Sequence, residues 1–178
     1  MGETSTLQIA RWKVAVDVQG TRAIYAQSTA GADACGCSAC QSYASVRHIA
    51  IPREARHVLD SLGIDPMKEE EVFGGYPDGT NSRRFEGWFH FLGEVLEGNS
   101  QGIVNVTPGF SFYLAAGPGG PAFERFKGKR TGVFEFAARI PDETPGFRPF
   151  GDEDAAEADA RGAPRGLEKL PRRHRVNG

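Results

Sequence analysis

Three cysteines lie within six residues of one another, and their spacing is the feature of this sequence with the clearest chemical meaning. Cys35, Cys37 and Cys40 form the pattern C-x-C-x2-C, with Gly36 between the first two. Thiolates at this spacing can converge on one ion. Zinc suits them because it accepts sulfur ligands in a tetrahedron and brings no redox chemistry of its own. The sequence therefore predicts a thiolate cluster that binds a structural zinc ion in a non-catalytic protein.

Zinc in a structural site takes four ligands, so one is missing from the local sequence. The candidates are a water molecule and four side chains: Asp33, His48, His57 and His90. His90 is the preferred candidate, because it lies in a predicted strand, where side chains are held rigidly. The predicted metal ligands are therefore Cys35, Cys37, Cys40 and His90.

Two other interpretations of the cysteines stay open. Free cysteines are commonly buried as small hydrophobic residues, which needs no particular spacing. Cys37-Ser38-Ala39-Cys40 also has the spacing of a redox-active C-x-x-C motif at a helix start, where the helix dipole lowers a thiol pKa. That motif needs a preceding strand, and residues 30–34 have poor strand propensity. Whether the protein is an enzyme is left open, because spatial pairing of catalytic residues is invisible in the sequence.

The remaining ionisable residues are expected to have ordinary structural roles. Glu69–Glu71 are predicted to form a solvated approach to a strand. Glu94 and Glu135 are expected to be exposed strand residues, with a buried functional acid as the alternative for either. His48 and His57 flank predicted helices and are expected to be exposed.

Hydrophobic periodicity predicts an α+β fold with a mostly antiparallel sheet and one or two short helices. A helix is predicted from Pro52 to Leu62, where apolar residues recur at helical spacing and Gly63 suits a left-handed C-terminal cap. A shorter helix is expected over residues 39–49. Residues 31–36 and 117–121 are expected to be loops. Strands are predicted over residues 7–18, 23–26, 72–76, 84–96, 103–106, 110–116 and 132–140. Short connections between successive strands favour antiparallel pairing.

The domain organisation predicted is one α+β domain over residues 1–141 and a disordered charged tail over 142–178. The tail is acidic as far as residue 160 and basic after it, with few large apolar residues. Burial there cannot offset the entropy of ordering the chain. The basic run Arg172-Arg173-His174-Arg175 could contact nucleic acid, but a solvated tail is the favoured interpretation.

Composition narrows the expected compartment and partners. The chain has 178 residues and a formal net charge of −2, so nucleic acid is not an expected partner. No secretory signal or membrane-spanning apolar stretch is present, and a cytoplasmic protein without a membrane partner is expected. A protein or small-molecule partner is left unidentified. An alternative function is a binding module whose aromatic residues line a groove: Trp88, Phe89, Phe91, Phe110 and Phe112.

Several segments of the chain together resemble a family of small bacterial proteins of uncharacterised activity. The motifs are the cysteine cluster followed by Tyr43, then Leu62-Gly63-Ile64-Asp65-Pro66, Gly87-Trp88-Phe89-His90-Phe91-Leu92-Gly93, and Val133-Phe134-Glu135-Phe136 before Ile140-Pro141. Members have an Asn before the aromatic residue, where this chain has Ser42. The resemblance spans most of the predicted domain and none of the tail. The resemblance implies no particular activity, but it implies that the cysteines and the strand of His90 are parts of one site.

Overall fold

An antiparallel sheet of seven strands forms the centre of the structure, a computed structural model that describes residues 3–79, 81–98, 101–117, 120 and 122–149. The strands are β1 (Ser5–Ile9), β2 (Trp12–Val16), β3 (Glu71–Pro77), β4 (Ser82–Glu97), β5 (Val104–Thr107), β6 (Phe110–Ala116) and β7 (Thr131–Pro141). Six of them follow the order β1-β2-β4-β7-β6-β5, β3 pairs with β4 outside this order, and every pair is antiparallel. The α+β class is therefore confirmed.

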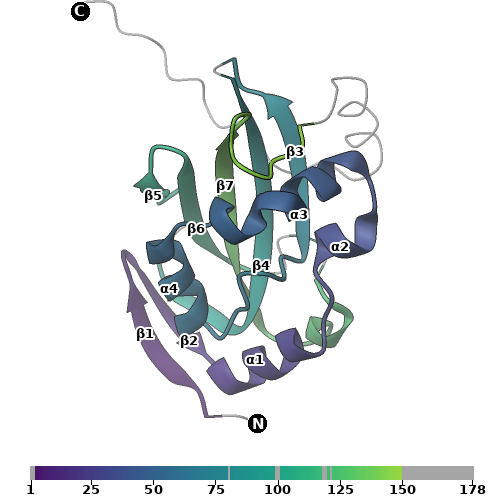
Figure 1. Cartoon of the computed structure of the whole chain (residues 1–178). Coiled ribbons are helices and arrows are strands. Elements are labelled where there is room, and N and C mark those ends of the chain that lie inside the picture. Colours follow the sequence, from purple (N-terminus) through teal and green to yellow (C-terminus); the bar gives the residue numbers. More distant parts are fainter. Residues whose placement is uncertain (1–2, 80, 99–100, 118–119, 121, 150–178) are drawn as a thin grey trace, which may run out of the picture.

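The long strand β4 organises this sheet, because it pairs with β7 along one edge and with two strands along the other. On that second edge, β3 pairs with the first half of β4 and β2 with its last residues. Strand β3 is therefore the edge strand beside the first half of β4, next to the segment that carries the cysteines (Figure 1).

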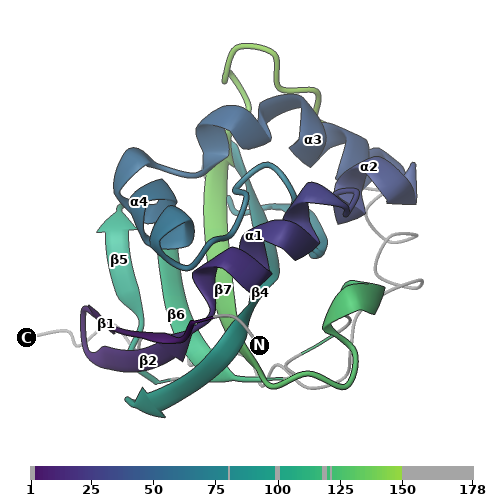
Figure 2. The same cartoon turned by 90° about the horizontal axis from the view of Figure 1, so that it is seen from below.

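The helices lie mainly on one side of the sheet (Figure 2). They are α1 (Val18–Ala26), α2 (Gly31–Cys35), α3 (Ser38–Ala50) and α4 (Arg53–Ser61), with a 3₁₀ turn, η1, at Glu124–Phe126. Tyr43 of α3 is fully buried and its ring lies 5.5 Å from that of Phe85 and 6.1 Å from that of Phe136. Contacts of this kind between helices and sheet form the hydrophobic core.

The aromatic residues proposed to line a groove belong to the buried part of the protein instead. Trp88, Phe89, Phe91, Phe110 and Phe112 are at most 3% exposed. Phe110 stacks on Phe136, and Phe112 stacks on Phe134. Buried rings cannot present a surface to a ligand, so the aromatic-groove interpretation loses its basis.

The N-terminal region differs from its prediction. The single strand expected over residues 7–18 is a hairpin of β1 and β2, and the strand expected over residues 23–26 is part of helix α1. Asp17 caps this helix by accepting a hydrogen bond from the Gly20 N–H at 2.8 Å, and Thr21 Oγ1 donates to the Asp17 carbonyl. The alternation of valines and the run Ala-Ile-Tyr-Ala favoured strands, but the cap and tertiary packing favour the helix.

The other described elements agree with their predictions, apart from residues 31–36, and most of the loop predicted over 117–121 lies outside the described residues. The predicted loop there contains the short helix α2, which ends at Gly36. Helix α4 ends as expected, with Gly63 at φ 78° and the Ile64 N–H donating to the Leu59 carbonyl at 2.9 Å. The helix predicted over residues 39–49 is α3, and the strands predicted after residue 70 correspond to β3 through β7.

The chain continues to pack against the sheet beyond Pro141, where the predicted domain ended. Phe147 is 9% exposed and lies edge-on to Phe85, and Ser42 Oγ donates a hydrogen bond to the Arg148 carbonyl. The rest of the predicted tail, including the basic run 172–175, lies outside the described residues. Among the described helices, none has the length and apolar character needed to cross a membrane.

Candidate metal centre

The three cysteines of the predicted cluster come together in the structure. The Sγ atoms of Cys35, Cys37 and Cys40 all lie within 4.8 Å of one another, and all three are free thiols. A tetrahedral zinc ion with Zn–S bonds of about 2.3 Å would hold its sulfurs about 3.8 Å apart. The thiols can therefore converge on one ion through small side-chain movements.

A sharp connection between two helices produces this convergence. Cys35 ends α2, Gly36 adopts φ 71°, and Cys37 is the N-cap residue of α3. Gly36 connects the two helices in a left-handed conformation, in which an L-residue would be strained. Cys40 lies in the first turn of α3, and the Gln41 side chain donates to the Gly36 carbonyl at 2.8 Å.

The cluster extends from the surface into the protein. Cys35 is exposed, Cys37 is half-buried and Cys40 is buried beside β3, where its Sγ lies 3.9 Å from the Val72 carbonyl oxygen. A backbone hydrogen bond from Cys37 lowers the pKa of Cys35. Burial, aided by the neighbouring thiols, raises the pKa of Cys40. A bound cation would oppose this effect of burial on the Cys40 thiol, because metal coordination deprotonates a thiol.

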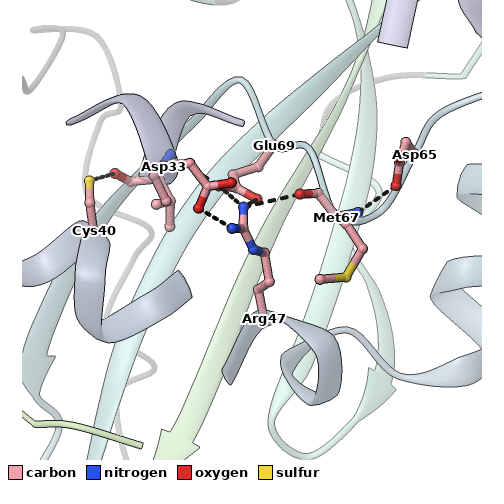
Figure 3. Close-up of polar contacts among 8 residues, drawn as sticks. Asp33, Cys40, Arg47, Asp65, Met67 and Glu69 are labelled. Atoms are coloured by element: carbon pink, nitrogen blue, oxygen red, sulfur yellow. Dashed lines mark hydrogen bonds and ion pairs between the residues drawn. The ribbon is translucent and has the colours of Figure 1, made fainter. Parts of the chain in front are cut away.

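An ion-pair network holds α2 against α3 and the start of β3, a short distance from the cluster. Arg47 of α3 forms a salt bridge with Asp33 of α2, donates to Glu69 at 3.2 Å and donates to the Met67 carbonyl at 3.0 Å (Figure 3). The Arg47 side chain is 9% exposed and that of Glu69 is fully buried. Because Asp33 is two residues before Cys35, this network fixes the segment that carries the first thiol.

Backbone contacts reinforce the same junction. The Gly31 N–H donates to the Glu69 carbonyl at 2.7 Å, and the Ala32 N–H donates to Glu69 Oε1 at 3.1 Å. A Cβ added to Gly31 would lie 2.3 Å from the Glu70 carbonyl oxygen, so only glycine permits this close approach. Burial raises the pKa of Glu69, and the charge of Arg47 opposes that shift.

His90, the predicted fourth ligand, is held in a different polar group. Its Nδ1 lies 2.8 Å from Glu70 Oε2, and its ring is fully buried. Glu70 also accepts hydrogen bonds from Tyr25 and from the backbone N–H groups of His90 and Phe123. Among the described residues, the group of mutually close ligand atoms comprises the three thiols without His90.

The other candidate fourth ligands also lie outside that group. Asp33 is engaged by Arg47, while His48 and His57 are exposed, as predicted.

Glu135 is half-buried and accepts a hydrogen bond from Tyr113, and burial raises its pKa, whereas Glu94 pairs with Arg130 at the surface.

The prediction for Glu69–Glu71 is wrong, since Glu69 and Glu70 are buried and Glu71 is half-buried. Three consecutive acidic residues suggested a segment exposed to solvent, but each of the two buried carboxylates has a partner far away in the sequence. Arg47 was also missed. The available signal was its spacing: it falls on the same face of α3 as Cys40 and Tyr43, where a charged residue needs a buried counter-charge.

Comparisons with known proteins add no relative. No family model matches the chain, and neither a search of curated proteins nor a search of solved structures finds a match.

Proposed function

We propose that this protein binds one zinc ion through Cys35, Cys37 and Cys40, and that the ion fastens the junction of α2 and α3 to the start of β3. The observation that carries this proposal is the mutual approach of the three sulfur atoms within 4.8 Å. Thiols that serve only to fill a core need no such convergence.

The chemistry of the site supports zinc in particular. Three thiolates are soft donors, which zinc and Cu(I) accept better than magnesium or calcium does. Two of the cysteines lie at the N-terminus of a thirteen-residue helix, where the helix dipole has its positive end. The ion would neutralise negative charge at a point where the thiol of Cys40 is otherwise buried.

The test is the zinc content and zinc affinity of reduced protein purified without chelator. We expect about one equivalent per chain in the wild type, as a single mononuclear site requires. Cys37→Ser should lose the ion, because two thiols and a hydroxyl bind zinc far more weakly. Ser38→Ala, next to the cluster, is the matched control and should retain it. A reduced wild type that takes up no zinc, even when zinc is supplied, would refute the proposal.

A thiol redox protein is the second candidate, favoured by the contrast between an exposed Cys35 with a lowered pKa and a buried Cys40 with a raised one. In that chemistry the Cys35 thiolate attacks a substrate disulfide and releases one substrate thiolate. A second cysteine then attacks the Cys35 sulfur of the mixed disulfide, which forms a disulfide between the two cysteines and releases the second substrate thiolate. The helix α2 stands where a redox C-x-x-C motif has a strand. Zinc binding in the wild type, lost in Cys37→Ser, decides for the first candidate.

A further inference from the structure

The carboxylate of Glu71 lies at the end of β3 that is nearest to the cysteines. Glu71 is the first residue of β3, and it precedes Val72, whose carbonyl oxygen is 3.9 Å from the Sγ of Cys40. The same end of β3 is tied to α2 through the contacts of Glu69 with Gly31 and Ala32. The backbone therefore places Glu71 beside the thiol cluster.

Glu71 also differs from its two acidic neighbours in having no hydrogen-bond or ion-pair partner among the described residues. Glu69 is paired with Arg47, and Glu70 with His90. Within the described part of the chain, the half-buried carboxylate of Glu71 makes no hydrogen bond or ion pair. Burial of an unpaired carboxylate is costly, and this burial raises the pKa of Glu71.

Among the described residues, no basic side chain at the junction forms an ion pair with Glu71. Arg47, the guanidinium of the junction, is already engaged by Asp33 and Glu69. The negative charge of Glu71 reaches Cys35, whose pKa it acts to raise. Among the described residues, three thiols and one nearby unpartnered carboxylate thus form a group that a divalent cation would stabilise.

We propose that Glu71 is the fourth ligand of the zinc ion, which completes a set of three thiolates and one carboxylate. This inference rests on the proposed zinc site. The Glu71 carboxylate is outside the group of ligand atoms within 4.8 Å of one another, so it must rotate about its side-chain torsions to reach the ion. Its half-buried, unpartnered state permits that rotation. His90 has no such freedom, because it is fully buried and held by Glu70.

The proposed ligand set has a consequence for metal choice. A carboxylate oxygen is a hard donor that zinc accepts readily and Cu(I) does not. Loss of Glu71 should therefore weaken zinc binding and leave Cu(I) binding, which depends on the sulfurs, nearly unchanged. A fourth protein ligand also closes the coordination sphere, which is typical of structural zinc and not of catalytic zinc.

The experiment compares metal affinity in the wild type, Glu71→Gln and Glu86→Gln, by competition with a chromophoric chelator. Glu86 is a suitable control, because it is also a half-buried strand glutamate but is paired with Arg84. We expect Glu71→Gln to lower zinc affinity by about 10-fold or more, at least the loss seen when an outer-shell partner is removed. Its Cu(I) affinity should stay within about 3-fold of the wild type, as expected if the thiolates alone set it. Glu86→Gln should match the wild type for both ions.

The spectrum of the cobalt-substituted protein gives a second measurement. The ligand-field bands should shift in Glu71→Gln, while the sulfur-to-cobalt charge-transfer bands, which report the thiolates, should persist. If the wild type binds zinc and Glu71→Gln binds it equally well with an unchanged cobalt spectrum, Glu71 is not a ligand and the three-thiolate site stands. If the wild type binds no zinc, the proposed function itself fails.

Discussion

Replacing Arg47 by Met is expected to destabilise the protein strongly, because it removes the counter-charge of a fully buried carboxylate. Glu69 would keep one hydrogen bond, from the Ala32 N–H, and lose both contacts with the guanidinium. Removing one partner of a buried ion pair costs about 3–5 kcal/mol. The exposed carboxylate of Asp33 adds little to this, since pairs of that kind contribute about 0–1 kcal/mol. The loss of Glu69's partner therefore dominates.

The pH dependence distinguishes this cause from a general packing defect. Burial already raises the pKa of Glu69 above its unfolded value, and loss of the Arg47 charge should raise it further. A carboxyl with a raised folded-state pKa destabilises the protein as pH rises from the unfolded pKa through the folded one. The deficit of Arg47→Met should therefore be largest near pH 8 and shrink as pH falls through the raised folded-state pKa toward the ordinary glutamate value of 4.5, below which Glu69 becomes protonated in both states.

Urea denaturation at pH 5 and pH 8, followed by far-ultraviolet circular dichroism, measures both quantities. Arg22→Met is the control, because Arg22 forms an exposed pair with Asp60 and should cost less than about 1 kcal/mol. The double variant Arg47→Met/Glu69→Gln removes the charge but keeps an acceptor for Ala32, so it should recover most of the loss. A deficit below about 1 kcal/mol for Arg47→Met at pH 8, well under the buried-pair range, would refute this reasoning. A deficit independent of pH, or a double variant no more stable than Arg47→Met, would refute it too.

Two further predictions concern the buried polar group and the thiols. Tyr25→Phe removes the hydroxyl that bonds to Glu70 and to the His90 carbonyl, so it should lower the free energy of unfolding by about 1–3 kcal/mol. A change near zero in urea denaturation would contradict the assigned contacts. In metal-free protein, an alkylating agent should modify Cys35 first and Cys40 last, as followed by mass spectrometry, because Cys35 is exposed with a lowered pKa and Cys40 is buried with a raised one. Zinc should slow the alkylation, and equal rates for Cys35 and Cys40 would show that the assigned environments are wrong.

Local sequence signals predicted the elements whose structure depends on nearby residues. Helix α4 was predictable from its apolar spacing, Pro52 and Gly63, which act within a few residues. Helix α1 was not, because Val18, Thr21, Ile24 and Tyr25 are β-branched or aromatic residues that favour strands. Its structure depends on the Asp17 cap and on burial of Tyr25 against Glu70 and His90.

The same distinction applies to the candidate metal centre. Three cysteines within six residues need only a local turn of the chain to bring their sulfur atoms together, so their convergence could be predicted from spacing. A fourth ligand must come from a distant part of the chain, and the sequence does not show which strand end lies beside the cluster. Histidine was chosen from its chemistry, but His90 is held by Glu70, a residue expected to be in solvent.

X-ray absorption at the zinc edge tests the central claim most directly, because it counts the sulfur atoms bound to the ion. For wild-type protein loaded with one equivalent of zinc, we predict three sulfur neighbours at about 2.3 Å and one oxygen neighbour at about 2.0–2.2 Å. A first shell made only of oxygen and nitrogen, or one containing fewer than three sulfur atoms, would contradict the assignment of Cys35, Cys37 and Cys40 as the metal ligands.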